Sequence, residues 1–267
     1  MLTGKSSIWL AAGPSCQPTG KPFGQSANIP ACQPVANALL SKTMVIVFVN
    51  SKGGVGKSTL AVHMTLWALD LGIATALVDC DKQQSSSDWL IEAEPRMALR
   101  MADTPEECVE KVVQLRQSHD LIIGDGPAGL DDVSRTLLLL ADVAILPLTP
   151  SILDLRSLQQ ATAILKYAQT LNGGRPEGRI VLNKMRTRDS ISAELRLAAP
   201  TMGVAVASTH IRDLQAYRDA AGQATSVMRL GSRAKPAAME MDALFRELLG
   251  DRLEELLKNR NPDHGGT

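Results

Sequence analysis

The fold of this chain is decided by one glycine-rich stretch, Lys52-Gly53-Gly54-Val55-Gly56-Lys57-Ser58-Thr59. An apolar run at 44–50 precedes it and has the composition of a buried parallel strand. Residues 60–70 follow it with apolar side chains at helical spacing. A strand, a glycine loop and a helix in this order predict a phosphate-binding loop, in which backbone N–H groups and a helix N-terminus hold an anion.

The polar residues of this loop have expected tasks toward ATP and Mg²⁺. Lys57 is expected to reach the β- and γ-phosphates, and the Ser58 hydroxyl is expected to bind Mg²⁺. The backbone from Gly53 to Thr59 would cradle the phosphates. The alternative is a chance glycine turn with two solvated lysines, which the flanking strand and helix oppose.

The loop departs from the common G-x-x-x-x-G-K-[ST] pattern. Ser51 stands at the first glycine position, and a second lysine, Lys52, opens the loop. In this it resembles the deviant Walker A loop of the ParA/MinD family of P-loop ATPases. The resemblance implies a homodimer that sandwiches ATP, in which Lys52 reaches the nucleotide of the partner subunit. It also implies ATP hydrolysis that is weak until a ParB-like or other partner protein stimulates it.

Acidic residues end two further apolar runs. The segment 76–81 ends in Asp79 and Asp81, and the segment 120–127 carries Asp125 before a glycine. Both resemble ParA segments, which implies that Asp81 positions the attacking water and that Asp79 and Asp125 lie at the Mg²⁺. Lys82 stands where the family has proline.

Two later segments resemble the base-binding part of the same family. Asn183 follows the apolar residues 180–182 and would face the adenine, and residues 209–213 would line the base pocket. Among the four histidines, none has a partner at metal or triad spacing, and we expect His63 to be structural.

Strands and helices are predicted to alternate from residue 44 onward. This pattern indicates an α/β fold, a doubly wound and mostly parallel sheet with helices on both faces. The expected strands are 44–49, 74–79, 97–101, 120–125, 142–147, 179–183 and 203–207. The expected helices are 57–71, 85–93, 104–118, 130–140, 151–171, 190–199, 212–221 and 238–257. We assign 44–258 to the ATPase domain, 1–43 to a disordered leader or a mis-called start before Met44, and 259–267 to a flexible tail; a signal peptide in 1–43 is a weaker alternative.

Composition restricts the class of protein. The 267 residues have a formal net charge of +0, and no apolar run approaches the 18 or so residues of a membrane span. The four cysteines form no C-x-x-C pair, which argues against a zinc site or a disulfide framework and fits the cytoplasm.

Basic residues concentrate between 179 and 235, where ten basic and four acidic residues give a net charge of +6. We interpret this stretch as a surface for non-specific DNA binding, which would associate the protein with the nucleoid. An ordinary fluctuation of surface charge is the alternative. The candidate contacts are Arg186, Arg188, Arg212, Arg218, Arg229, Arg233 and Lys235.

The resemblance therefore implies a partition or positioning ATPase that segregates a plasmid, a chromosome region or a protein cargo. The alternative is a MinD-like, membrane-associated regulator of the division site, which the acidic C-terminal helix opposes, so no membrane partner is expected. An iron–sulfur relative lacks its ligands because no cysteine follows Cys108, and a tyrosine kinase lacks its tyrosine-rich tail.

Overall fold

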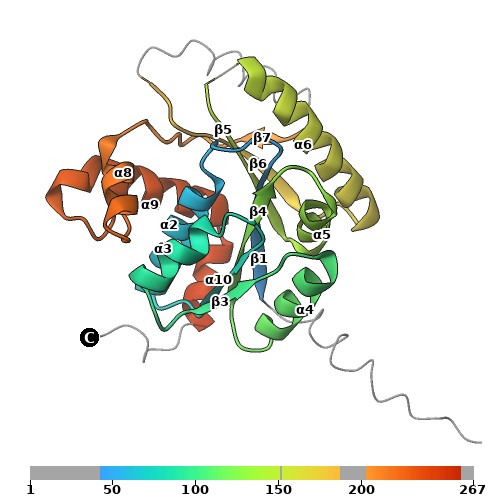
Figure 1. Ribbon diagram of the computed structural model, residues 1–267, viewed down its shortest axis with the longest axis horizontal. Helices are drawn as coiled ribbons and strands as arrows, with labels where there is room; N and C mark the ends of the chain where they lie inside the picture. Colours follow the sequence, from blue (N-terminus) through green and yellow to red (C-terminus); the bar gives the residue numbers. More distant parts are fainter. Residues whose placement is uncertain (1–42, 151, 187–202, 260–267) are drawn as a thin grey trace, which may run out of the picture.

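A computed structural model describes residues 43–150, 152–186 and 203–259 of the chain (Figure 1). Within them, seven strands form one sheet in the order β3-β2-β4-β1-β5-β6-β7, and all the paired strands are parallel. The strands are β1 Met44–Asn50, β2 Thr75–Asp79, β3 Ala98–Met101, β4 Leu121–Ala128, β5 Val143–Leu148, β6 Glu177–Leu182 and β7 Ala205–Val206. The predicted doubly wound fold is confirmed.

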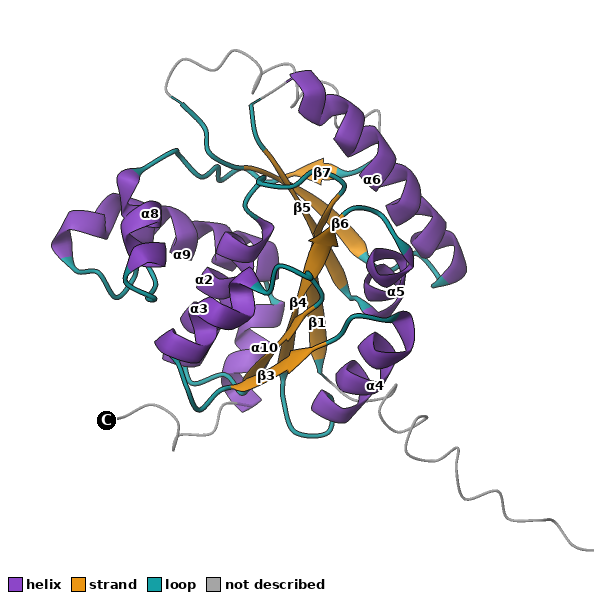
Figure 2. Ribbon diagram, in the orientation of Figure 1, coloured by secondary structure: helices purple, strands orange, loops and turns teal. Residues whose placement is uncertain are grey.

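Helices cover both faces of this sheet (Figure 2). One face carries α2 Lys57–Asp70, α3 Ser85–Ala93, α8 Gln215–Gly222, α9 Lys235–Leu249 and α10 Arg252–Asn259, with the short 3-10 helix η2 Ser232–Ala234. The other face carries α4 Pro105–Leu115, α5 Asp132–Leu140 and α6 Ile152–Leu171. The leader up to residue 42, the predicted helix 190–199, Arg188 and residues 260–267 lie outside the described residues.

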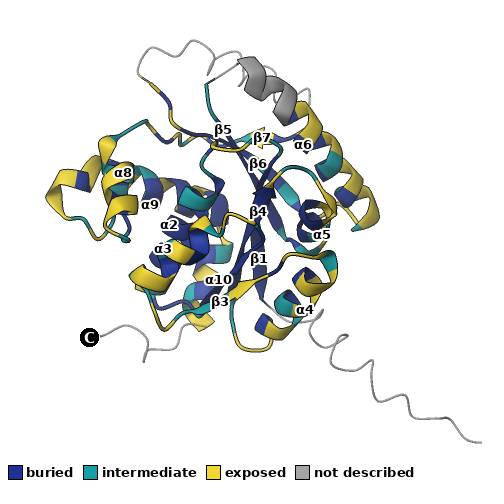
Figure 3. Ribbon diagram, viewed as in Figure 1, coloured by how far each residue is buried: buried dark blue, intermediate teal, exposed yellow. Residues whose placement is uncertain are grey.

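Alternation along the central strands separates two apolar cores. Ile46 and Phe48 of β1 pack with α2 and α9, whereas Val45 and Val47 pack on the side of α5 and α6. Each such side chain is fully buried and contributes about 1.5–3 kcal/mol to folding. Figure 3 shows the sheet buried between exposed outer helix faces, which explains the continuous apolar runs of the sequence.

The C-terminal region differs from the single helix predicted for 238–257. Helix α9 ends at Leu249, and Gly250 adopts φ 51°, a left-handed conformation that an α-helix does not continue. A new helix begins at Arg252 and packs Leu253 and Leu256 into the core. In the part of the chain that the structure describes, no helix has the length and apolar character needed to cross a membrane.

His63 of α2 connects the helix that follows the glycine loop to the C-terminal region. Its Nδ1 lies 2.7 Å from the Thr59 carbonyl oxygen, and its Nε2 lies 3.2 Å from the Val227 amide nitrogen. Since that amide can only donate, Nε2 is the acceptor and Nδ1 carries the proton. Burial lowers the pKa of His63 to about 4, partly opposed by the Thr59 carbonyl. The ring is therefore neutral in the folded protein, as expected of a structural histidine.

We predict that His63 makes the protein less stable in mild acid. The unfolded chain takes up a proton at His63 near pH 6.5 and the folded protein only near pH 4, so stability is full above pH 6.5 and falls as the pH decreases. Between pH 7.5 and pH 5 this histidine should remove about 2 kcal/mol from the free energy of unfolding. Denaturant unfolding of the wild type and of His63→Asn at both pH values measures the effect. The variant should show the smaller change, since every other titrating group is common to both proteins; equal changes would contradict the assignment.

Candidate nucleotide site

The glycine loop connects the end of β1 to the start of α2. Gly54 and Gly56 have φ angles of 75° and 96°, which residues with a β-carbon rarely adopt. Gly56 also directly precedes the first turn of α2. A β-carbon there would lie 2.1 Å from Nδ2 of Asn183, so glycine also leaves room for this side chain against the loop.

Asn50, the last residue of β1, shapes the start of the loop. Its buried side chain donates from Nδ2 to the Pro147 carbonyl oxygen at 2.6 Å and accepts from the Lys52 amide at 3.0 Å. The sequence analysis gave Asn50 no role. The sequence did carry a signal for it: Asn50 is a polar residue that ends an apolar run directly before the glycine loop.

Lys57 lies beneath the loop with only 5% of its surface exposed. Its Nζ donates to the Lys52 carbonyl oxygen over a long 3.4 Å. Burial lowers the pKa of Lys57, while the charges of Asp125 and Asp81 raise it. A buried ammonium with one long hydrogen bond can gain a strong interaction from a polyanion such as a nucleotide phosphate chain. The side chain of Lys52 is half-buried at the same loop.

Asp125 is a fully buried carboxylate within the C-terminal half of β4, beside Asp79 of β2 in the strand register. Burial raises its pKa to about 7, and the charge of Asp79 adds to this. The hydroxyls of Ser58 and Ser86 lie near enough to lower that pKa in part. Even so, neither oxygen of Asp125 has a hydrogen-bond partner among the described residues.

This arrangement fits a magnesium ion that arrives with a nucleotide. The two oxygens of Asp125 and the Ser86 hydroxyl are buried and unsatisfied, a costly state that an oxygen-preferring cation or its bound water would relieve. No group of three or more His, Cys, Asp or Glu side chains within the described ranges could hold a metal alone. Ser58 and Asp125 would thus hold Mg²⁺ together with phosphate oxygens.

Asp79 is committed to the protein itself. One carboxylate oxygen accepts from the Asp81 amide at 3.0 Å, and the other accepts from the Ser87 amide and hydroxyl at 2.9 and 2.7 Å. These bonds tie the segment between β2 and α3 to the strand end. Ser87 is a residue that sequence reasoning missed, while the role of Asp79 at the metal stays a prediction. Asp81 is half-buried, and one of its oxygens accepts from the Gln83 amide at 3.0 Å.

Asn183 contacts the glycine loop directly. Its Nδ2 donates to the Val55 carbonyl oxygen at 2.8 Å. The contact of Asn183 with adenine stays a prediction. Residues Thr209 and Arg212 line an open groove of about 900 Å³ between the segment after β7 and the start of α9.

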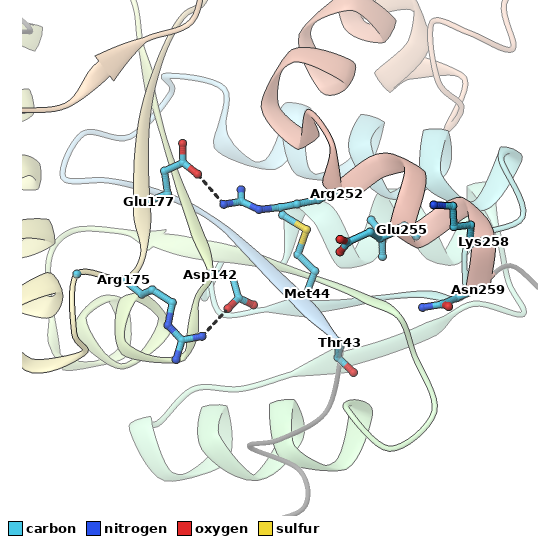
Figure 4. A pocket seen from close by; sticks show the side chains of 11 residues that line it. Thr43, Met44, Asp142, Arg175, Glu177, Arg252, Glu255, Lys258 and Asn259 are labelled. Atoms are coloured by element: carbon cyan, nitrogen blue, oxygen red, sulfur yellow. Dashed lines mark hydrogen bonds and ion pairs between the residues drawn. The ribbon is translucent and has the colours of Figure 1, made fainter.

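A second cavity, of about 690 Å³, lies at the opposite edge of the sheet (Figure 4). It opens where β1, β5 and β6 begin, next to α10. Two ion pairs lie in its lining, with Arg175 3.3 Å from Asp142 and Arg252 2.7 Å from Glu177. The glycine loop and the acidic strand ends lie at the carboxyl edge, so this cavity is not the candidate site.

Comparison with known proteins gives the family. Residues 46–227 match the model of the CobQ/CobB/MinD/ParA nucleotide binding domain. The chain belongs to this family. The maintenance of carboxysome distribution protein A of Halothiobacillus neapolitanus is 27% identical over 214 residues, which cover 78% of this chain and 98% of that protein.

Solved structures of ParA/MinD proteins share the fold. A variant of Cyanothece McdA in complex with ATP superposes with a TM-score of 0.64 at 18% identity, over 79% of this chain and 97% of that one. MinD of Aquifex aeolicus superposes with a TM-score of 0.62 at 18% identity, over 78% and 98%. The predicted membership of the ParA/MinD family is confirmed.

We predict that Asp125→Asn stabilises the nucleotide-free protein at pH 8 and removes its response to Mg²⁺ and ATP. The pKa of Asp125 is about 7 when folded and about 4 when unfolded, so its stabilising effect is full below pH 4 and is lost as the pH rises through 7. Ionising it in the core costs on the order of 4 kcal/mol, which asparagine avoids. Thermal melts at pH 5 and pH 8, with and without Mg²⁺ and ATP, are the measurement. The gain should be larger at pH 8 than at pH 5; an equal effect at both, or a full Mg²⁺–ATP response in the variant, would contradict the role.

Proposed function

We propose that this protein is an ATP-dependent positioning ATPase of the ParA type. The observation that carries the proposal is the glycine loop with Lys52 at its start and with Lys57 and Asp125 beneath it. The likeness to a carboxysome distribution protein along nearly its whole length supports a cargo-positioning role. The cargo would be a plasmid, a chromosome region or a large protein assembly, linked through a ParB-like or other partner protein.

The residues divide the work of ATP hydrolysis. The loop amides from Gly53 to Thr59 and Lys57 bind the phosphates, and Ser58 and Asp125 hold Mg²⁺, which neutralises developing phosphate charge. Asp81 is half-buried on the segment that Asp79 anchors, and we assign it the role of orienting the attacking water. Hydrolysis yields ADP and phosphate and stays weak until the partner protein acts.

The active form is a homodimer that closes on ATP. The two lysines belong to one loop, because Nζ of Lys57 lies 3.4 Å from the Lys52 carbonyl oxygen. Their surroundings differ, since Lys57 is buried and Lys52 is half-buried. Lys57 acts within its own subunit, and Lys52 reaches the ATP of the partner.

A MinD-like regulator at the membrane is the alternative function. Helix α10 buries Leu253 and Leu256 in the core and exposes Glu254 and Glu255. This helix therefore has no free apolar face to offer an anionic membrane, which favours the DNA-associated interpretation.

The two lysines should fail in different ways. We expect Lys57→Ala to abolish ATP binding, because the phosphates lose their main cation in the same subunit. We expect Lys52→Ala to retain measurable binding but to form no ATP-dependent dimer. Nucleotide titration together with light scattering after size-exclusion chromatography measures both. ATP-dependent dimers of Lys52→Ala at wild-type level would refute the cross-subunit role, and undiminished ATP binding by Lys57→Ala would refute the function itself.

Ion pairs distinguish the candidate DNA contacts from one another. Arg229 pairs with Asp70 and Glu94, Arg212 pairs with Glu240, and Arg218 and Arg186 share Asp213. In the part of the chain that is described, no carboxylate pairs with Arg233 or Lys235, and both are exposed. We therefore propose that these last two, in η2 and at the first residue of α9, make the larger contribution to binding phosphate.

DNA binding should require ATP, ignore sequence and weaken steeply with salt. Arg233→Glu combined with Lys235→Glu should reduce affinity at least tenfold and make the salt dependence shallower, with ATP dimers intact. The matched control is Lys111→Glu with Arg135→Glu, which changes net charge equally on α4 and α5 and should retain most of the affinity. Surface-binding titrations on two unrelated duplexes, with ATP and with ADP, are the measurement. Equal binding with both nucleotides would count against this model.

A further inference from the structure

Side chains from the end of β6 hold the outer surface of the glycine loop. The Lys184 ammonium donates to the Gly54 carbonyl oxygen at 2.8 Å, and the neighbouring Asn183 amide donates to the Val55 carbonyl oxygen at 2.8 Å. Two consecutive carbonyls of the loop are thus bound from one dipeptide about 130 residues away in sequence. With these carbonyls bound by Asn183 and Lys184, the amides of the same loop segment are held in one orientation.

The backbone of Lys184 is in an uncommon conformation. Its φ is 56°, a left-handed value that is unfavourable for a residue with a β-carbon. Two hydrogen bonds maintain it, one from the Lys184 amide to Oδ1 of Asn183 at 2.9 Å and one from the Met185 amide to the Ile211 carbonyl oxygen at 2.9 Å. Glycine or asparagine would adopt this turn more easily, so the turn alone does not call for lysine.

We propose that Lys184 is a positioning residue that fixes the glycine loop in its anion-binding shape before nucleotide arrives. The loop contains Gly53, Gly54 and Gly56, whose backbones lose much entropy when they are ordered. Bonds that order them in the free protein lower the cost of ordering at binding. Lys184 acts through the Gly54 carbonyl in its own subunit, so its task differs from those of Lys57 and Lys52.

Three substitutions separate the side chain from the backbone. Lys184→Gly and Lys184→Asn both accept the left-handed turn, and neither reaches the Gly54 carbonyl. Lys184→Arg keeps the charge and the reach, and it serves as the conservative rescue. Two readouts are needed: hydrogen–deuterium exchange of peptides covering 50–60 without nucleotide, and equilibrium binding of ATP and of ADP with Mg²⁺.

We expect the Gly and Asn variants to exchange the loop amides about fivefold faster and to bind ATP and ADP five- to tenfold more weakly. The Arg variant should stay within about twofold of the wild type in both. At saturating ATP the weakened variants should still dimerise, unlike Lys52→Ala. Unchanged exchange and unchanged affinity would overturn the proposal. Weaker binding with unchanged exchange would also overturn it, since Lys184 would then act on the nucleotide directly.

The inference rests on the proposed nucleotide site, and the exchange experiment separates the two claims. If wild-type protein binds no nucleotide while the Gly and Asn variants exchange faster, then the proposed function fails and the positioning of the loop stands. If ATP binds equally to all the variants and exchange is unchanged, the function stands and the positioning role fails.

Discussion

The common direction of all seven strands is the constraint on which the site depends. Parallel strands end at one edge of a sheet. The glycine loop after β1, Asp79 at the end of β2, Asp125 in the C-terminal half of β4 and the amide after β6 therefore meet there, although the sequence separates them widely. The covering helices bury both faces, which leaves this edge as the place where backbone N–H groups and side chains can meet a ligand. The candidate ligand-binding groups therefore gather at the edge of the sheet where polar groups are not taken up by strand pairing.

Two neighbouring carboxylates show how differently such groups are accommodated. Asp79 is satisfied by three hydrogen bonds from its own chain, whereas Asp125, its register partner, has none among the described residues. The first stabilises the segment that carries Asp81, and the second, when ionised, is a buried charge that destabilises the folded protein. The raised pKa of Asp125 reflects the same cost, because burial disfavours its ionised form. A satisfied carboxylate and an unsatisfied one thus lie on neighbouring strands.

The sequence predicted the fold and the glycine loop before α2 because their signals are local. Apolar runs located all seven strands, and the loop pattern identified Gly56 and Lys57 without any knowledge of tertiary contacts. The contacts of Lys184 with Gly54 and of Asn50 with Pro147 were not predictable, since they join residues 130 and 97 positions apart in the sequence. The break of the C-terminal helix at Gly250 was missed because one glycine inside an apolar helical pattern often causes no break.

A chain of side chains joins the nucleotide site to the C-terminal helices. His63, one turn after Thr59, contacts Trp89 of α3 and Tyr217 of α8 edge to face, with ring centroids 5.4 and 5.9 Å apart. The Trp89 indole donates to the Thr225 carbonyl oxygen at 3.1 Å, and α3 directly follows the segment of Asp81. Movement of that segment would therefore have to carry α3 against this aromatic cluster or break the hydrogen bond. Because packed aromatic rings do not deform gradually, the cluster joins α2, α3 and α8 firmly to one another.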